Sequence, residues 1–318
     1  MTALSVIIPA KDVAPYIGTA LSSLARNHHP DFEYIVVDDG STDGTGDIVE
    51  SHHRTLPGLR MIRNETPAGP SEARNQALAM ASGRYITYLD GDDWLAPGYL
   101  SRALAAIRDL DVDFVKTDHV QVYGAKRLVH HAPEGRINRP LDPRAGIMPA
   151  NCKTMVDYPY AWSGVFDRER LTDDLMRFEP ALHSCEDRLW TWQLHLKAKS
   201  YARVPEIGVF YRRLVSDSLT QVGDQRQLHF LDAFAQLIEQ VSTTPGDEGF
   251  LPKAARSFCA ILTHHIELED RLTRELRREM SVRGTAMMRA LPEDLLDRTL
   301  REMGGKRAKR LRTFWGAA

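Results

Sequence analysis

Three aspartates stand within four positions, directly after an apolar and aromatic segment, in the stretch YITYLDGDDW at residues 85–94. Carboxylates this close together repel one another, and loss of water makes each charged form costlier. Asp90 and Asp92 are separated by Gly91, which permits a tight backbone approach. Two such acids could share a hard divalent cation with phosphate oxygens. The spacing leaves one alternative open, a solvated turn that caps the next helix.

A second acidic segment, DGSTDGTGDIVE at residues 39–50, resembles an EF-hand calcium loop in its spacing of acids and glycine. That loop must follow a helix, whereas the preceding FEYIVV has the composition of a strand. Its third position is Ser41, where an acid or amide is wanted. The pattern therefore favours a strand-to-helix turn whose acids cap a helix or receive a ligand.

Several enzyme classes are disfavoured because their glycine-rich motifs are missing. No G-x-G-x-x-G follows the first predicted strand, and the chain contains neither G-x-x-x-x-G-K-[ST] nor G-x-S-x-G. A dinucleotide-dependent oxidoreductase, a P-loop hydrolase and an esterase therefore lose their main support.

Composition predicts a reduced, cytoplasmic protein that binds no nucleic acid. The chain has 41 basic and 43 acidic residues among 318, a formal charge of -2. No segment approaches the ~18 apolar residues of a membrane span, and the N-terminus turns polar too soon for a signal peptide. No C-x-x-C pair occurs, so neither a disulfide framework nor a zinc site is indicated for the cysteines Cys152, Cys185 and Cys259.

Histidines occur as adjacent pairs at 28–29, 52–53, 130–131 and 264–265. Neighbouring residues point in different directions on a helix or strand, so the pairs lack the spacing of metal ligands. We expect them at the surface.

The C-terminal segment GGKRAKRLRTFWGAA departs from the neutral balance of the chain. Its cations are Lys306, Arg307, Lys309, Arg310 and Arg312, followed by Phe314 and Trp315. Such a segment could contact an anionic membrane surface or polymer, which would place the protein at the inner face of the membrane. A solvated or partly packed terminus is the alternative.

Strand and helix patterns alternate four times in the first third of the chain. The apolar segments 4–9, 32–37, 59–63 and 85–89 predict strands, and 13–24, a stretch from 48, 71–81 and 97–110 predict helices. This order is typical of an α/β fold, a Rossmann-like and mostly parallel sheet with helices on both faces. Ligands bind such sheets beyond the carboxyl ends of the strands. The polar segments PAKD, DDGS and LDGDD all fall at such ends.

The pattern changes in the second half of the chain. Residues 113–123 and 201–213 look extended, a helix is expected from about 185, and residues from 225 onward are helical with apolar stripes. We expect two domains, 1–222 and an all-α C-terminal domain at 223–318. The stripes predict burial against an acceptor, the first domain or a second copy in a homo-oligomer.

A resemblance to a known protein family narrows the possible functions of the chain. The segments LSVIIPAKD, EYIVVDDGSTDGT, GPSEARNQAL, GRYITYLDGDDW and SCEDRLW occur in the order and spacing of the inverting GT-A glycosyltransferases of family 2. The resemblance covers roughly residues 3–222, and the set of motifs is specific although each alone is not. The order of parts is also similar to the wall teichoic acid N-acetylglucosaminyl transferases.

The resemblance implies roles for residues around a nucleotide. Asp39 would accept a hydrogen bond from uracil N3–H, and Arg74, with Asn75 as a companion, would approach the base or diphosphate. Helix capping and a surface salt bridge are the alternatives for Asp39 and Arg74. The cleft and its rim would be formed by Pro9, Ala10, Lys11 and Asp12.

The acids of the opening segment acquire roles in the same way. Asp90, next to Gly91, would reach the ribose and the metal, and Asp92 would bind Mn²⁺ or Mg²⁺ directly. In SCEDRLW, Asp187 would be the base that takes the acceptor proton, and Glu186 would orient it or contact the sugar. Exposed acids in a first helical turn are the alternative for that pair.

The chain departs from the family at one motif. Relatives with YR-x-H-x-x-S bring a histidine towards the diphosphate and metal, but Leu214 stands in its place here. Arg212 and Arg213 could supply positive charge to the diphosphate instead. Two further positions, Asp118 and His119, could face the sugar, although a surface position at a strand end is favoured.

The resemblance implies a metal-dependent inverting glycosyltransferase. It would move a sugar, such as N-acetylglucosamine, from a UDP-sugar to a hydroxyl of a cell-surface polymer such as teichoic acid, or of a glycolipid. A nucleotidyltransferase of similar fold would want a glycine-rich basic loop after the first strand, which PAKDVAPY lacks. A non-catalytic carbohydrate-binding or scaffold module is opposed by the presence of Asp39, Asp90, Asp92 and Asp187.

Overall fold

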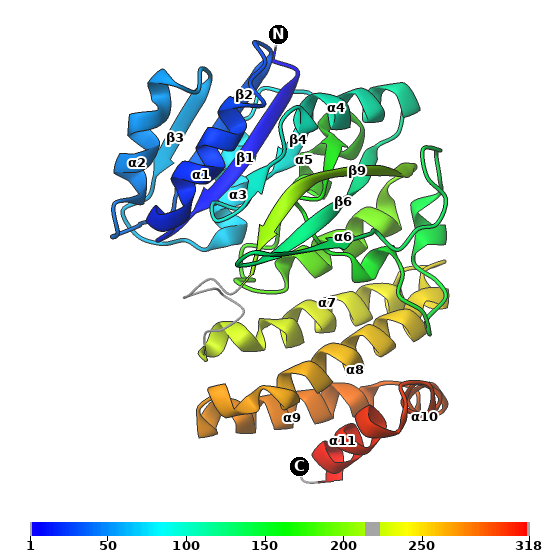
Figure 1. The fold of residues 1–318 in the computed structure, drawn as a ribbon. Coiled ribbons are helices and arrows are strands. Elements are labelled where there is room, and N and C mark those ends of the chain that lie inside the picture. The colour runs from blue at the N-terminus through cyan, green and yellow to red at the C-terminus, as the bar shows by residue number, and fades with distance from the viewer. Residues whose placement is uncertain (1, 214–222, 317–318) are drawn as a thin grey trace.

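The computed structural model describes residues 2–213 and 223–316, and it places nine strands of that part of the chain in one sheet (Figure 1). The strand order is β3-β2-β1-β4-β8-β6-β9-β5, with β7 paired to β6. The strands are β1 (Leu4–Ala10), β2 (Phe32–Asp38), β3 (Leu59–Arg63), β4 (Tyr85–Tyr88), β5 (Trp94–Leu95), β6 (Phe114–Tyr123), β7 (Lys126–His130), β8 (Gly164–Asp167) and β9 (Tyr201–Arg212).

The main strands run in the same direction, as the prediction of a mostly parallel sheet requires. β3, β2, β1 and β4 are mutually parallel, and β2 is buried along its whole length, as its FEYIVVD sequence predicts. β8 is antiparallel to both β4 and β6, so β6 and its parallel partner β9 run in the direction of β4. β5, β7 and β8 run the other way and make the sheet mixed. We call the edge where β1, β2 and β4 end the carboxyl edge, and the opposite edge the amino edge.

Helices cover both faces of the sheet (Figure 1). Those of the first 213 residues are α1 (Ala14–Ala25), α2 (Thr45–Ser51), α3 (Pro70–Met80), α4 (Tyr99–Leu110), α5 (Arg168–Met176) and α6 (Glu186–Lys197). α1 and α2 pack together on one face, and right-handed crossovers place α3 on the other, since its chain returns across β1 to reach β4. Short 3-10 turns occur at η1 (His52–Arg54), η2 (Pro143–Gly146), η3 (Met155–Asp157), η4 (Gln225–Leu228), η5 (Glu248–Phe250) and η6 (Glu269–Arg271).

The rest of the described chain is helical and lies below the sheet in Figure 1. Its helices are α7 (His229–Thr243), α8 (Leu251–Glu267), α9 (Arg274–Ala290), α10 (Glu293–Glu302) and α11 (Gly305–Gly316). Their apolar cluster includes Leu189, Trp192 and Leu196 of α6, whereas Trp190 and Leu194 belong to the cluster of the sheet. α6 is therefore shared by both cores. The proposed boundary between 222 and 223 adjoins residues 214–222, which lie outside the described chain, and the two-domain division stays a prediction.

The basic C-terminal segment is a partly packed helix. Ala308 and Leu311 of α11 are buried in the C-terminal core, while its five cations are exposed and Arg310 pairs with Glu267. The expectation that all paired histidines lie at the surface is wrong for His265. That ring stacks on Phe230 at 4.1 Å and burial lowers its pKa to about 3.

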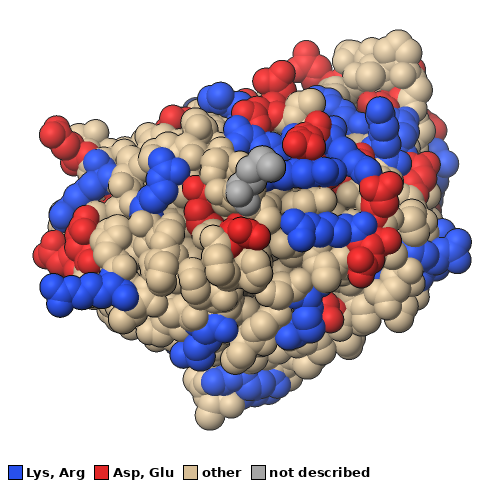
Figure 2. Space-filling model, turned by 90° about the horizontal axis from the view of Figure 1, so that it is seen from above, with Lys and Arg blue, Asp and Glu red and all other residues tan. Residues whose placement is uncertain are grey.

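No helix within residues 2–213 and 223–316 is long and apolar enough to cross a membrane. All three cysteines are free thiols. The face at the amino edge, around the start of β1, carries basic and acidic side chains in close alternation (Figure 2).

Candidate active site

The acidic loop that follows β4 lies against the end of β1. The main-chain NH of Asp93 donates to the carbonyl of Asp90 at 3.0 Å, which closes a tight turn. A Cβ at Gly91 would lie 3.3 Å from the carbonyl oxygen of Pro9 and 3.1 Å from a methyl of Val13. Only glycine allows this approach without displacement of its neighbours, so the loop is fixed at the carboxyl edge.

Asp92 and Asp93 differ in how their charge is accommodated. Burial, and then repulsion by Asp90, raises the pKa of Asp92 to about 6. Burial raises the pKa of Asp93 well above its ordinary value, and its Oδ1 accepts the main-chain NH of Arg212 at 2.7 Å. Asp93 thus attaches the loop to β9. The carboxylate of Asp92, in contrast, forms no ion pair with any described residue.

Arg212 lies beside this loop. Its Nε donates to the carbonyl of Asp92 at 2.9 Å, and its guanidinium lies 4.6 Å from the ring centroid of Trp94 and 4.8 Å from that of Tyr16. The guanidinium of Arg213 instead donates to the hydroxyl of Tyr211 at 2.7 Å. Leu214, which stands where relatives have histidine, is outside the described residues.

Arg74 joins the acidic loop to the first turn of α6. Its Nη1 donates to Glu186 at 2.8 Å and its Nη2 to Asp90 at 3.0 Å, with only 6% of the residue exposed. A surface salt bridge is therefore excluded for Arg74. The bridge brings together two acids that are 96 positions apart in the sequence (186 − 90 = 96).

Asn75, the predicted companion of Arg74, makes a local bridge. Its side-chain amide donates to the carbonyl of Phe178 at 2.9 Å and accepts the NH of the same residue at 2.9 Å. Asn75 thus holds the segment that leads to α6, and a contact with nucleotide stays a prediction.

Glu186 and Asp187 occupy different environments although they are adjacent. Glu186 is buried and paired with Arg74, whereas Asp187 forms no ion pair within the described residues. Burial, and then the charge of Glu186, raises the pKa of Asp187 to about 7. A carboxylate whose pKa lies near neutrality is suited to accept a proton from a hydroxyl.

The loops after β1 and β2 are tied to each other. The Asp39 NH donates to the carbonyl of Ala10 at 2.8 Å. Lys11 pairs with Asp12 at 3.0 Å, and Asp12 accepts the NH of Thr42 at 2.8 Å. These contacts place the residues predicted for the nucleotide cleft along one rim, at the carboxyl edge.

Asp39 is buried and holds the loop before α3. Its Oδ1 accepts from the Asn64 side chain and the Ala68 NH, each at 2.8 Å, and its Oδ2 accepts the Gly69 NH at 2.8 Å. Helix capping of α2 is therefore not its role. Its Oδ2 accepts one hydrogen bond and can accept a second. The predicted hydrogen bond from uracil N3–H to Asp39 therefore stays a proposal.

Sequence reasoning placed Asp118 and His119 at the surface, and this is wrong. Both are buried, as is β6 from Phe114 to Val122, because this strand lies inside the sheet and is covered on both faces. His119 Nδ1 lies 2.5 Å from the hydroxyl of Tyr158, and burial lowers its pKa to about 3. Its ring is surrounded by those of Tyr158, Tyr160, Trp162 and Tyr211.

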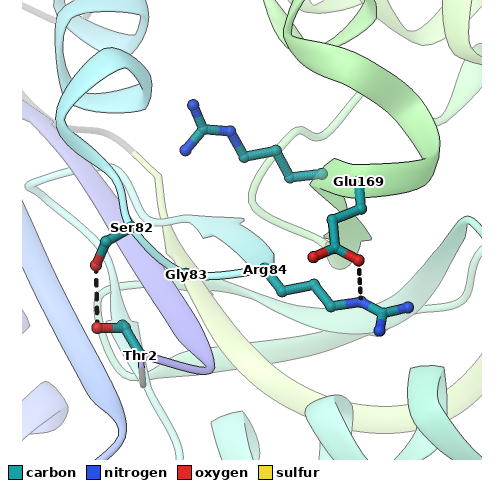
Figure 3. A pocket seen from close by; sticks show the side chains of 6 residues that line it. Thr2, Ser82, Gly83, Arg84 and Glu169 are labelled. Carbon is teal, nitrogen blue, oxygen red and sulfur yellow. Dashed lines mark hydrogen bonds and ion pairs between the residues drawn. The ribbon is translucent and has the colours of Figure 1, made fainter.

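A pocket at the amino edge was not anticipated and does not match the predicted chemistry (Figure 3). It contains Arg84 and Arg168, but Arg84 pairs with Asp167 and Glu169. Arg168 pairs with Asp173. Cations that are already neutralised have little charge to offer a ligand, so we place the candidate site at the carboxyl edge.

The carboxylates of this site suit a divalent cation that the substrate would also help to bind. Within the described residues no three His, Cys, Asp or Glu side chains form a metal cluster. Asp90 and Asp92 are a two-carboxylate set, and Mg²⁺ is commonly bound by one or two carboxylates plus substrate phosphates and water. The raised pKa of Asp92 marks a carboxylate that a cation would stabilise.

Comparisons with known proteins identify the family of the chain. The family model for glycosyl transferase family 2 matches residues 5–163. The poly(ribitol-phosphate) β-N-acetylglucosaminyltransferase TarS of Staphylococcus aureus strain Mu50 is 30% identical over 218 residues, 66% of this chain and 35% of that protein. The putative teichuronic acid biosynthesis glycosyltransferase TuaG of Bacillus subtilis strain 168 is 40% identical over 90 residues, 28% of this chain and 36% of that protein. The chain thus spans about a third of the length of these curated relatives.

Solved structures share the fold. The crystal structure of S. aureus TarS 1-349 in complex with UDP-GlcNAc has a TM-score of 0.74 at 21% identity and covers 99% of this chain and 91% of that one. The mannosyltransferase PcManGT of Pyrobaculum calidifontis, in complex with GDP-Man and Mn²⁺, has a TM-score of 0.55 at 19% identity and covers 98% and 86%. At these identities the likeness concerns the fold alone.

Proposed function

The chain belongs to glycosyl transferase family 2 and is a glycosyltransferase, and on this premise we propose that it transfers a sugar from a UDP-sugar to a hydroxyl with inversion. The observation that carries the proposal is the Arg74 bridge, which joins the acidic loop to the turn that contains Asp187. The bridge thereby holds the acids that we propose for metal and diphosphate binding close to the proposed proton acceptor. Family membership decides against a nucleotidyltransferase or a scaffold module.

In the proposed reaction the acceptor oxygen attacks the anomeric carbon and forms the new glycosidic bond. The bond from that carbon to the diphosphate oxygen breaks, and its electron pair leaves with UDP. The hydroxyl proton passes to the carboxylate of Asp187. Arg74 orients Glu186 beside this base, and Arg212 offers a fixed cation next to the diphosphate position.

A divalent ion, Mn²⁺ or Mg²⁺, held by Asp90 and Asp92 would neutralise the charge of the departing diphosphate. This metal dependence is part of the proposal. Its support is the pair of closely spaced carboxylates and the raised pKa of Asp92.

N-acetylglucosamine is the proposed donor sugar, and a cell-surface polymer such as teichoic acid, or a glycolipid, is the proposed acceptor. The support is the similarity to TarS, whose structure is known with UDP-GlcNAc. We place the enzyme at the cytoplasmic face of a membrane, where the exposed cations of α11 would contact anionic lipid. Homo-oligomer formation through α7 to α11 stays a prediction.

A donor panel tests the proposal. The purified protein is incubated with Mn²⁺, an acceptor polymer and UDP-, GDP- or dTDP-sugars, and the released nucleoside diphosphate is measured. We expect release of UDP from UDP-GlcNAc, and none without metal. Release of pyrophosphate, or a preference for GDP-sugars, would contradict the proposal.

A further inference from the structure

The loop that leads into α6 has a backbone conformation that is rare for its sequence. We call residues 182–185 the entry loop; it comes directly before the first turn of α6, which carries Asp187. Its last residue, Cys185, has a φ of 60° and a ψ of 8°, in the left-handed region. The carbonyl of Cys185 accepts the NH groups of Arg188 at 3.2 Å and Leu189 at 3.3 Å, so this residue sets the direction in which α6 starts. A residue with a Cβ keeps such a conformation only where its surroundings hold it.

On one side the entry loop packs against the start of α3. Ser71 of α3 is buried, and its Oγ donates to the carbonyl of Leu182 at 2.6 Å. A Cβ at Gly69 would lie 2.8 Å from Cε1 of His183, so the imidazole of His183 lies directly against the main chain there. The NH of Gly69 donates to Oδ2 of Asp39 at 2.8 Å. The entry loop therefore packs on the rim where we propose that the nucleotide binds.

On the other side the C-terminal helices hold the entry loop. His229 is the first residue of α7, and its Nδ1 accepts the main-chain NH of His183 at 2.8 Å. Since an amide NH can only donate, Nδ1 of His229 is unprotonated, and burial, which lowers the pKa of His229, favours this form. The ring centroids of the two histidines lie 5.5 Å apart in an edge contact. In addition, Oγ of Ser184 donates to the carbonyl of Arg226 at 2.5 Å.

The two acceptor groups on the helical side are fixed by their own contacts. The carboxylate of Asp224 accepts the NH of Arg226 at 3.0 Å and its guanidinium at 2.6 Å, which caps η4. Phe230 and Phe234 of α7 are buried in the C-terminal core. The atoms that hold the entry loop therefore belong to the packed start of α7.

We propose that His229 is a positioning residue, which holds the entry loop so that the first turn of α6 presents Asp187 to the acceptor hydroxyl. The inference rests on the proposed function, because it requires Asp187 to be the base. The Arg74 bridge holds Glu186, which follows Cys185, whereas the contacts of the entry loop hold the chain before Cys185. By this account the C-terminal helices contribute to catalysis without contact with the substrate.

The test compares His229→Ala with His229→Asn. Asparagine carries an oxygen at about the position of Nδ1 and can accept the NH of His183, whereas alanine cannot. At saturating donor and metal we expect kcat to fall about tenfold in His229→Ala, since a small displacement of a catalytic group is costly. In His229→Asn it should recover to within about threefold of wild type. KM for the UDP-sugar should stay within about twofold in both variants, because no proposed donor contact is removed.

Phe234→Leu is the matched control on the same helix. Phe234 is buried, its ring centroid lies 5.8 Å from that of Phe258, and it has no polar atom for the entry loop. This variant should lower the melting temperature at least as much as His229→Ala, while kcat stays within about twofold. An equal loss of kcat in Phe234→Leu and His229→Ala, or in both His229 variants, would assign His229 a role in stability alone and overturn the inference. If His229→Ala does not fold, Ser184→Ala takes its place: we expect about a threefold loss of kcat, and an unchanged kcat would contradict the inference.

A second measurement does not depend on turnover. Hydrogen exchange of the main-chain amides in residues 182–190, followed by mass spectrometry, reports how firmly the entry loop and the first turn of α6 are held. We expect at least about fivefold faster exchange in His229→Ala, and the wild-type rate in His229→Asn and Phe234→Leu. Unchanged exchange in His229→Ala would contradict the inference. If exchange is faster but the wild type releases no UDP from any donor, His229 does hold the entry loop and the proposed function fails, which overturns only the catalytic consequence.

Discussion

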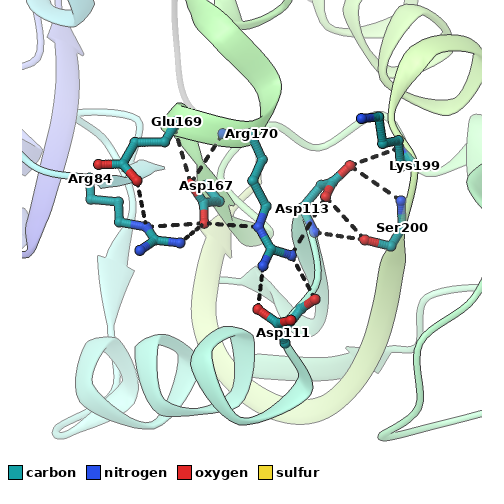
Figure 4. A network of polar contacts seen from close by, with 8 residues as sticks. All are labelled: Arg84, Asp111, Asp113, Asp167, Glu169, Arg170, Lys199 and Ser200. Carbon is teal, nitrogen blue, oxygen red and sulfur yellow. Dashed lines mark hydrogen bonds and ion pairs between the residues drawn. The ribbon is translucent and has the colours of Figure 1, made fainter.

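The two edges of the sheet differ in how completely their acids are paired with cations and main-chain donors. At the amino edge, Asp167 is buried and accepts from Arg84 at 2.7 Å, and Arg170 reaches both Asp111 and Asp113 (Figure 4). Asp113 also accepts the NH of Lys199 at 2.7 Å. Each acid in this network has a cation or a main-chain donor, so its charge stabilises the junction of β4, β6, β8 and β9.

At the carboxyl edge the acids outnumber their partners. Arg74 engages Glu186 and Asp90, but Asp92 and Asp187 form no ion pair among the described residues, and burial raises their pKa values to about 6 and about 7. A fold selected only for stability would not concentrate such groups. The contrast shows that incomplete charge pairing, rather than the abundance of charge, distinguishes the edge where we propose that a ligand binds.

The largest expected effect comes from loss of the base. Asp187→Asn should lower turnover about 1000-fold, because proton transfer by a positioned carboxylate contributes on the order of 10²–10⁴. Affinity for the UDP-sugar, measured by calorimetry, should stay within a few-fold. Wild-type turnover in this variant would show that another residue acts as the base.

Disruption of the bridge should have the next largest effect. Arg74→Met leaves Glu186 and Asp90 without their common cation, and we expect about a 100-fold loss of turnover. Arg74→Lys should restore little, since one ammonium cannot hold two acids in the fork geometry of a guanidinium. Arg170→Met at the amino edge is the control and should keep turnover while it lowers the melting temperature. Equal turnover in Arg74→Met and Arg170→Met would contradict the claim that the two edges differ in their contribution to activity.

A third prediction concerns pH. The pKa of Asp187 is raised to about 7, so the ionised base is lost as pH falls through 7. Turnover should therefore fall about tenfold for each pH unit below about 6.5. Steady-state kinetics at saturating donor and metal measure this profile. A flat profile from pH 5 to 8 would be incompatible with a base of this pKa.

The smallest effect on activity is expected at the amino edge. Asp167→Ala removes the cap of α5, where its carboxylate accepts the NH of Glu169 at 3.1 Å, together with the ion pair to Arg84. We expect about 2 kcal/mol less free energy of unfolding in urea, from the lost cap and buried hydrogen bonds. Turnover should remain within about twofold. A larger loss of turnover would mean that the two edges are coupled.

The order of elements and the acidic motifs could be predicted from the sequence, because apolar periodicity and turn residues are local signals. The strands at 32–37, 59–63 and 85–89 match β2, β3 and β4 closely. Asp90 stands out for the same reason, whereas Asp187 was predicted from the resemblance of SCEDRLW to the family.

The contacts between distant segments could not be predicted. Nothing local indicates that Arg74 bridges Glu186 and Asp90, or that α6 belongs to two hydrophobic cores. Lys116 and His119 lie in a strand whose polar residues suggest exposure, yet the place of β6 inside the sheet buries both. Burial on both faces of a strand is a property of the assembled sheet, and only the structure reveals it.

The central claim is that the under-paired acids of the carboxyl edge receive a divalent ion together with a nucleoside diphosphate. Electron paramagnetic resonance of free Mn²⁺, recorded as UDP is added to wild type, Asp92→Asn and the amino-edge variant Asp111→Asn, measures this directly. We predict uptake of Mn²⁺ with UDP by wild type and Asp111→Asn, and at least about tenfold weaker uptake by Asp92→Asn. Equal uptake by all three proteins, or none by any of them, would contradict the account.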